Sequence, residues 1–248
     1  MQYIILSPCM GIKYLIDEQY FESWSPEMAY ILGFLYADGS LENAPKLRGK
    51  YVRATSTDLE VIKHIKKSLR SEHRIIIIPS FRKRKERYLF RAGSHVLFDS
   101  LTQHGLFPNK SLSMKFPKNI PSNYLSHFIR GYFDGDGCVH LSQARNREGA
   151  LLVKRLGVVF TSGSELFLKE LEREIRNVLN IKKRNIYKSR RSFQLRYSTT
   201  DSIELFTLIY ANTKNLFYLG RKKEIFLRYF KLRPQRINTN IGKMLKNM

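Results

Sequence analysis

The sequence predicts an α+β fold built from two repeats, each with the element order α-β-β-α-β-β-α. A nine-residue motif occurs twice, at residues 31–39 (ILGFLYADG) and 129–137 (IRGYFDGDG). Shorter matches follow both motifs in the same order: Thr-Ser at 55–56 and 161–162, then Leu-Phe at 106–107 and 216–217. Both halves also alternate helical and strand periodicities between similar turn residues. Matches in a constant order indicate an internal duplication.

The first half begins with the motif helix. Ser25 is predicted as its N-cap, Pro26 takes the first helical position and Gly39 ends it. Strands are predicted after it, of which the one at 51–55 has assigned bounds, followed by an amphipathic helix at 58–69, a strand at 74–78, a basic loop at 81–87, a strand at 88–91 and a short helix at 95–101.

The second half repeats this order. We predict a motif helix at 123–136, strands at 139–142 and 151–161, a helix at 165–179, strands at 186–188 and 193–197, and helices at 203–211 and 216–231. The chain therefore divides into an N-terminal extension (1–24), a first repeat (25–118), a second repeat (119–231) and a basic C-terminal tail (232–248). The tail is either a mobile terminus or an arm that lies along a phosphate backbone.

The charge of the chain indicates its class of partner. Its 248 residues include 44 Lys and Arg against 21 Asp and Glu, a formal net charge of +23. This excess favours nucleic acid or an anionic membrane, but no apolar run approaches the roughly 20 residues of a spanning helix. The first residues lack the features of a secretory signal, and two cysteines are too few for a disulfide framework or a zinc site. We expect a soluble protein of the bacterial cytoplasm or of an organelle, not secreted and not bound to membranes.

Both motif helices carry small residues four positions apart, Gly33 with Ala37 and Gly131 with Gly135. Small faces let two helices approach closely, which would bring the carboxylates of Asp38 and Asp136 together at one end of the pair. An Asp-Gly helix end by itself is more often a simple terminator, but two matched copies favour a functional pair. Two adjacent carboxylates repel each other without a cation, and oxygen ligands suit Mg²⁺ better than Zn²⁺. A metal in a basic protein indicates hydrolysis of a nucleic-acid backbone.

The two motifs resemble those of the LAGLIDADG homing endonucleases of the single-chain, two-motif type. The lead-in at 24–30 (WSPEMAY) and the phrase at 105–111 (GLFPNKS) are similar to the intron-encoded branch. The resemblance implies a monomer in which a central pair of motif helices supports two antiparallel sheets that form a DNA-binding saddle. It also implies Mg²⁺-dependent cleavage of both strands of a long, asymmetric DNA site.

The resemblance carries over residue by residue to the motif ends. The family's catalytic, metal-binding acids correspond to Asp38 and Asp136, and the carbonyls before them belong to Ala37 and Gly135. The copies differ at the sixth motif position, which is Tyr36 in the first and Asp134 in the second. They also differ at the seventh position, which is Ala37 in the first and Gly135 in the second, and neither difference removes an acid of the eighth position.

Two alternatives stay open on the same scaffold. One is an RNA maturase that binds its intron RNA, and the other is a DNA-binding protein without catalysis. Two intact acids favour cleavage over the second.

Further candidates are basic side chains. Arg91 and Arg196, on matching strands, are candidates for the water network around the reacting phosphate, although ordinary surface cations would occur there equally often. Basic runs at the same β-β connection of both halves, and a cluster in the long hairpin after the second motif, are predicted to bind DNA. These residues are Arg82, Lys83, Arg84, Lys85, Arg87, Arg145, Arg147, Lys182, Lys183, Arg184, Lys188, Arg190 and Arg191.

Overall fold

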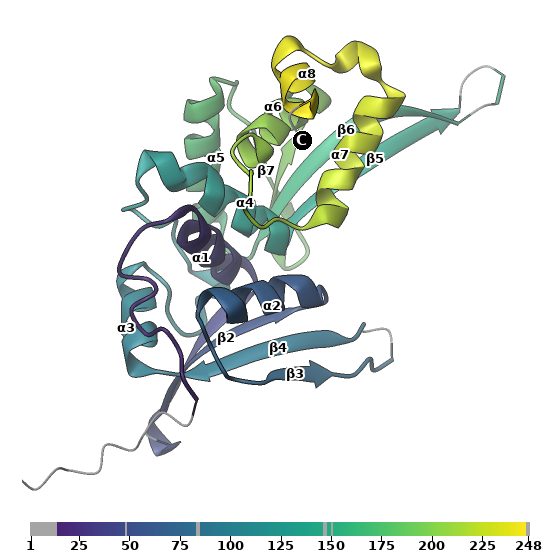
Figure 1. Ribbon diagram of the computed structural model, residues 1–248. Coiled ribbons are helices and arrows are strands. Elements are labelled where there is room, and N and C mark those ends of the chain that lie inside the picture. Colours follow the sequence, from purple (N-terminus) through teal and green to yellow (C-terminus); the bar gives the residue numbers. More distant parts are fainter. Residues whose placement is uncertain (1–13, 48, 83–84, 146–147, 150, 247–248) are drawn as a thin grey trace, which may run out of the picture.

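The structure is a computed structural model that describes residues 14–47, 49–82, 85–145, 148–149 and 151–246. It confirms the predicted fold class, because two four-stranded antiparallel sheets have matching strand orders, β1-β2-β4-β3 and β5-β6-β8-β7 (Figure 1). The strands of the first sheet are β1 (Gly39–Ala44), β2 (Gly49–Ser56), β3 (Ile75–Ile78) and β4 (Arg87–Gly93). Those of the second are β5 (Gly137–Arg145), β6 (Leu151–Ser162), β7 (Ile186–Ser189) and β8 (Ser192–Tyr197).

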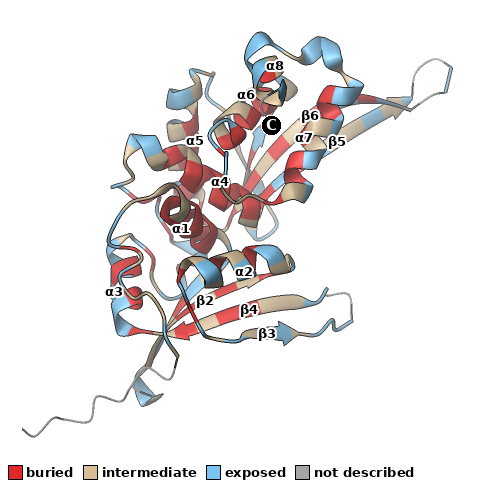
Figure 2. Ribbon diagram, viewed as in Figure 1, coloured by how far each residue is buried: buried red, intermediate tan, exposed pale blue. Residues whose placement is uncertain are grey.

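The motif helices, α1 (Pro26–Asp38) and α4 (Leu125–Asp136), pack on each other at the centre of the molecule. Figure 2 shows that both are buried along most of their length. The hydroxyl of Ser25 accepts a hydrogen bond from the Met28 amide, so the predicted N-cap of α1 is confirmed. The first strand of each sheet begins directly at the terminal glycine of the preceding motif: β1 begins at Gly39 and β5 begins at Gly137.

The remaining helices cover one face of each sheet. They are α2 (Leu59–Ser68) and α3 (His95–Gln103) in the first repeat, and α5 (Glu165–Leu179), α6 (Thr199–Tyr210) and α7 (Gly220–Leu232) in the second. Along β2, the buried Val52 and Ala54 alternate with the half-buried Arg53, which lies directly opposite Arg91 of β4. Each sheet therefore has a packed apolar face and an open polar face.

The C-terminal part of the chain differs most from the prediction. The helix predicted at 203–211 begins at Thr199, because Ser198 and Asp201 form a reciprocal capping box. The helix predicted at 216–231 begins only at Gly220.

Part of the predicted tail and part of the predicted extension are folded. Helix α8 (Thr239–Lys246) buries Ile241 and lies near the end of α6 (Figure 1). At the other end of the chain, Phe21 is buried, and the Asp17 amide donates to the carbonyl of Leu69. Residues 1–13 of the extension lie outside the described residues. Among the helices that the structure does describe, none is long and apolar enough to cross a membrane.

Candidate active site at the ends of the motif helices

The two motif helices touch through their backbones. A Cβ atom added to Gly33 would lie 2.1 Å from the carbonyl oxygen of Phe128, and one added to Gly131 would lie 1.9 Å from that of Tyr30. The two contacts are equivalent, because each glycine is the third motif residue and each carbonyl precedes the motif of the other helix. The predicted small-residue contact is therefore present in the structure.

This contact brings the two acidic helix ends together. A Cβ atom on Gly135 would lie 2.3 Å from the Cβ of Ala37 and 3.5 Å from Oδ2 of Asp38. Burial, followed by the charge of Asp136, raises the pKa of Asp38 from its usual 3.8 to about 6. Burial also raises the pKa of Asp136. Asp38 is nevertheless exposed to solvent at the end of its helix, so solvent screens part of this effect.

Two buried lysines face the carboxylates, one from each repeat. Lys110 lies in a short 3₁₀ turn (Lys110–Leu112) and its Nζ donates to the carbonyl of Tyr36 at 2.7 Å. Lys222, on α7, donates from Nζ to the carbonyls of Phe133 (2.5 Å), Asp134 (2.8 Å) and Gly137 (2.6 Å). Each lysine thus places a positive charge at the negative, C-terminal end of a motif helix.

The electrostatic coupling between these lysines and the acids runs both ways. Burial lowers the pKa of Lys110 and of Lys222 to about 8; Asp136 and Asp38 oppose this change at Lys110, and Asp134, followed by Asp38, opposes it at Lys222. Both lysines in turn oppose the rise in the pKa of Asp38 and of Asp136.

The sequence analysis did not single out these lysines. A signal exists in the repeat itself, because Lys110 follows the Leu-Phe match at 106–107 and Lys222 follows the one at 216–217. The spacing differs by two residues, so the two positions do not align in the sequence.

A pocket of about 250 Å³ opens beside Asp38, between the two repeats. Arg221 crosses it from the second repeat and makes a bidentate ion pair with Asp58 of the first repeat, with both N–O distances 2.7 Å. Arg87, predicted to bind DNA, also lines this pocket.

Comparisons with known proteins agree with this geometry. Residues 123–209 match the family model described as a LAGLIDADG-like domain. This range covers most of the second repeat, so that half of the chain is similar to a LAGLIDADG-like domain. The fold of the chain is that of solved LAGLIDADG endonucleases: the I-LtrWI homing endonuclease bound to target DNA is 16% identical, with a TM-score of 0.54 over 92% of this chain and 96% of that one. The I-CpaMI meganuclease bound to uncleaved DNA is 14% identical, with a TM-score of 0.57 over 91% and 97%.

A third relative, I-SmaMI, was solved on an uncleaved DNA target in the presence of calcium ions; it is 14% identical, with a TM-score of 0.54 over 91% of this chain and 96% of that one. Among curated proteins, no sequence matches this chain. The structural likeness shows the LAGLIDADG fold, while the activity of this chain rests on its own residues.

The structure brings Asp38, Asp136, Ala37 and Gly135 together at the centre of this LAGLIDADG fold. Arg91 and Arg196 instead lie on the open faces of the two sheets, since the strand residues next to them are buried.

The two arginines are held in different ways. The guanidinium of Arg91 stacks on the ring of Tyr51 at 3.6 Å, and its Nε donates to Glu42 at 3.3 Å. Arg196 donates from two nitrogens to the side-chain oxygen of Gln194, at 3.0 and 2.7 Å. Their place in a water network stays a prediction.

Only part of the predicted basic runs lies at hairpins of the two sheets, because Lys182, Lys183 and Arg184 lie between α5 and β7 and Lys188 lies on β7. Arg82 and Lys85 are exposed between β3 and β4, and Arg190 and Arg191 are exposed between β7 and β8. Also exposed are Lys182, Lys183 and Lys188. Lys83, Arg84 and Arg147 lie outside the described residues.

Two of the predicted DNA contacts already have protein partners. Arg184 pairs with Asp201 of α6, with two N–O distances of 2.8 Å. Arg145 donates to the carbonyl of Gly149 within its own hairpin at 2.8 Å. A DNA contact by Arg184 would have to compete with its ion pair.

Proposed function

We propose that this protein is a metal-dependent, site-specific DNA endonuclease that cuts both strands of a long, asymmetric target by phosphodiester hydrolysis. The observation that carries the proposal is the meeting of Asp38 and Asp136 between two buried lysines, where one acid and one lysine come from each repeat. A duplicated site offers one acid for each strand of a duplex.

The donor atoms fit Mg²⁺. Among the described residues, no group of three or more His, Cys, Asp and Glu side chains could hold a metal. Asp38 and Asp136 would therefore hold the ion with carbonyl oxygens, such as those of Ala37 and Gly135, and with oxygens of water and phosphate. Such an all-oxygen set is typical of Mg²⁺. A bound Mg²⁺ would activate water and stabilise the leaving oxygen.

The protein's own cations would favour the same reaction. Lys110 and Lys222 are 5% and 4% exposed, so water screens their charges little. Positive charges fixed beside a phosphate stabilise the extra negative charge of the transition state. Their hydrogen bonds to helix carbonyls hold both ammonium groups in place before the substrate arrives.

The surface around this centre fits double-stranded DNA. The open sheet faces carry the arginines, the hairpin ends carry part of the exposed basic runs, and the whole chain has a net charge of +23. Because the two repeats are joined in one chain and differ in sequence, a monomer would recognise an asymmetric site.

The experiment is a two-step selection. Duplexes from a large random pool are first retained on the protein in Ca²⁺, then released by cleavage after exchange into Mg²⁺, and the new ends are sequenced. The control is the Asp38→Asn/Asp136→Asn protein, which should bind the same duplexes without cutting them. One long consensus cut on both strands by the unmodified protein alone is expected. Cleavage by the double variant, or binding of a consensus that the unmodified protein never cuts, would overturn the proposal.

A further inference from the structure

The sixth motif position holds chemically unlike residues, Tyr36 in α1 and Asp134 in α4. Both are almost fully buried, with exposures of 0% and 2%. The proposed cleavage chemistry assigns no role to either residue, although each lies two positions before a catalytic acid. Their hydrogen bonds show what they share.

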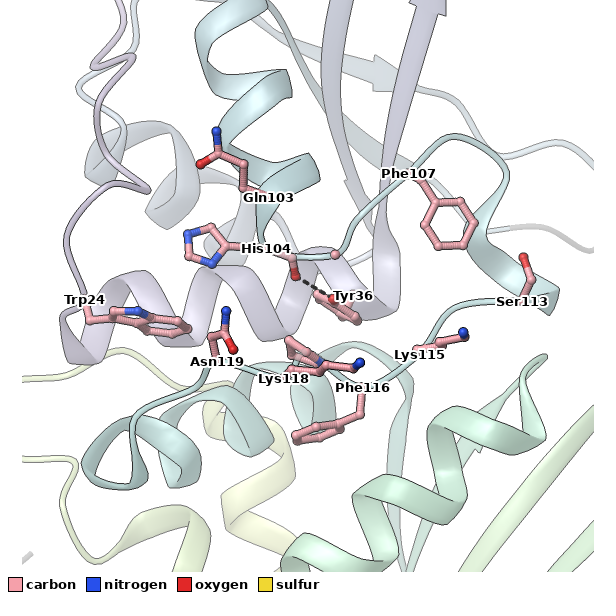
Figure 3. Close-up of a pocket in the computed structure, with 12 residues that line it drawn as sticks. Trp24, Tyr36, Gln103, His104, Phe107, Ser113, Lys115, Phe116, Lys118 and Asn119 are labelled. Atoms are coloured by element: carbon pink, nitrogen blue, oxygen red, sulfur yellow. Dashed lines mark hydrogen bonds between the residues drawn. The ribbon is translucent and has the colours of Figure 1, made fainter.

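Tyr36 binds the segment that carries Lys110. Its hydroxyl donates to the carbonyl of His104 at 2.7 Å, and its own main-chain carbonyl accepts from Lys110 Nζ at 2.7 Å. Figure 3 shows the first of these bonds at the wall of a pocket of about 460 Å³. Gly105, which follows His104 in the sequence, has a φ of +90°, and a Cβ atom there would lie 2.7 Å from the hydroxyl oxygen of Tyr36. The turn from His104 to Lys110 is therefore fitted closely around the hydroxyl of Tyr36.

Asp134 makes the corresponding contacts in the second repeat. Its Oδ2 accepts from the Leu219 amide at 2.9 Å, and its main-chain carbonyl accepts from Lys222 Nζ at 2.8 Å. Leu219 is the N-cap residue of α7, and Lys222 lies in the first turn of that helix. The carboxylate thus fixes the start of the helix that carries the lysine.

We propose that Tyr36 and Asp134 are positioning residues, each of which holds the lysine-bearing segment of its own repeat against its own motif helix. Tyr36 donates a hydrogen bond to a carbonyl, whereas Asp134 accepts one from an amide. A donor in one repeat and an acceptor in the other therefore have the same structural role. The inference rests on the proposed function, in which each half of the site serves one DNA strand.

The two tethers are separate, so their loss has separate consequences. Removing the bond of one sixth-position side chain displaces one lysine and leaves the other in place. The corresponding strand is then cut more slowly, and nicked DNA accumulates. A residue needed only for the stability of the central helix pair would slow both strands equally.

The experiment measures cleavage of each strand on a duplex labelled at both ends. Tyr36→Phe and Asp134→Ala should each slow one strand relative to the other by about three- to tenfold, the worth of one buried hydrogen bond, and the two variants should affect opposite strands. Asp134→Asn should restore balanced cutting, because its amide oxygen can accept from the Leu219 amide. Its NH₂ would replace Oδ1, which makes no hydrogen bond to the described part of the chain.

Tyr30→Phe is the matched control. Its hydroxyl donates to the same Oδ2 of Asp134 at 2.9 Å, and its ring packs edge-to-face on Phe217, a contact that a phenylalanine ring keeps. Loss of the hydroxyl should slow both strands by the same factor. Equal slowing of both strands by Tyr36→Phe and Asp134→Ala, or a strand bias with Tyr30→Phe, would overturn the inference.

Amide hydrogen exchange of the free protein tests the tethers without DNA. The Leu219 amide should lose protection in Asp134→Ala and keep it in Tyr30→Phe. The amides of Gly105 and Leu106, bonded to Thr102 and Leu101, should exchange faster in Tyr36→Phe. Unchanged protection in these variants would refute the tethers even if cleavage is never observed. Failure of the unmodified protein to cut any selected site would refute the proposed function instead.

Discussion

Replacing Gly131 by alanine tests the backbone contact between α1 and α4. The added methyl carbon would lie 1.9 Å from the carbonyl oxygen of Tyr30, 2.8 Å from its carbonyl carbon and 2.9 Å from the amide nitrogen of Phe34. Non-bonded carbon atoms prefer about 3.5–4.0 Å, so the helices must part by more than ~1 Å. All three atoms belong to the backbone of α1, so no change of rotamer can relieve the clash.

The expected cost follows from the energy of overpacking. Inserting a methyl group into a packed core costs about 1–3 kcal/mol, and sometimes more. Alanine recovers up to ~1 kcal/mol through its higher helix propensity. Since the whole interface between α1 and α4 must open, the upper end of this range applies, and we expect Gly131→Ala to lose about 2 kcal/mol of unfolding free energy in urea denaturation.

The reciprocal contact makes the test sharper. Gly33→Ala should cost a similar amount, because its methyl group would meet the carbonyl of Phe128 at 2.1 Å. The double variant should cost less than the sum of the two, since helices parted by one methyl group admit the second. Gly220→Ala is the control: it lies in the first turn of α7 with no atom within 4 Å of the added carbon. Additive losses, or a Gly131→Ala protein as stable as the unmodified one, would refute the backbone contact.

Three further predictions concern charge. The pKa of Asp38 is raised to about 6, so ionisation of this carboxyl group costs folding stability as the pH rises from about 4 to about 6. Over that range, Asp38→Asn should gain about 1 kcal/mol of stability relative to the unmodified protein, after solvent screening. Glu224→Gln, at an exposed carboxylate, should not gain stability. A double-mutant cycle of Arg221→Ala and Asp58→Ala, followed by thermal unfolding, should give a coupling below about 1 kcal/mol that falls with added salt; a salt-independent coupling would contradict an ion pair whose arginine side chain is 53% exposed. The affinity for DNA should fall steeply with salt, and Arg190→Gln should reduce the slope of log K against log salt by about one; an unchanged slope would remove this side chain from the phosphate contacts.

The central helix pair could be predicted from the sequence because its determinants are local. The small residues at Gly33 and Gly131, the N-cap at Ser25 and the terminal glycines act within a few positions of the helices that they shape. The convergence of Asp38 and Asp136 then follows from the duplication, since equivalent positions meet at a twofold contact.

The lysines and the arginine pairing depend on long-range contacts, which periodicity does not encode. Lys110 and Lys222 reach the site from segments more than 70 residues away from the helix carbonyls that they bind. Arg184 lies in a basic run, but its partner Asp201 belongs to a helix whose start was misplaced in the prediction. A basic run in a sequence indicates positive charge, but it does not show which of its side chains form ion pairs within the protein.

The two repeats have the same residue at the third motif position, where each helix contacts the other in the same way. They have different residues at the sixth motif position, where each side chain binds a segment of its own repeat. Each of the two third-position glycines faces a backbone carbonyl of the other helix, so a side chain at either one separates both helices. The lysine-bearing segment that each sixth-position side chain binds belongs to its own repeat. A tyrosine hydroxyl and an aspartate carboxylate can therefore occupy equivalent positions. The condition is that the lysine-bearing segment presents a carbonyl to the hydroxyl, as His104 does, or an amide to the carboxylate, as Leu219 does. In a single chain such exchanges are free to occur in one half alone, so each half can hold its lysine in its own way while Asp38 and Asp136 stay in register.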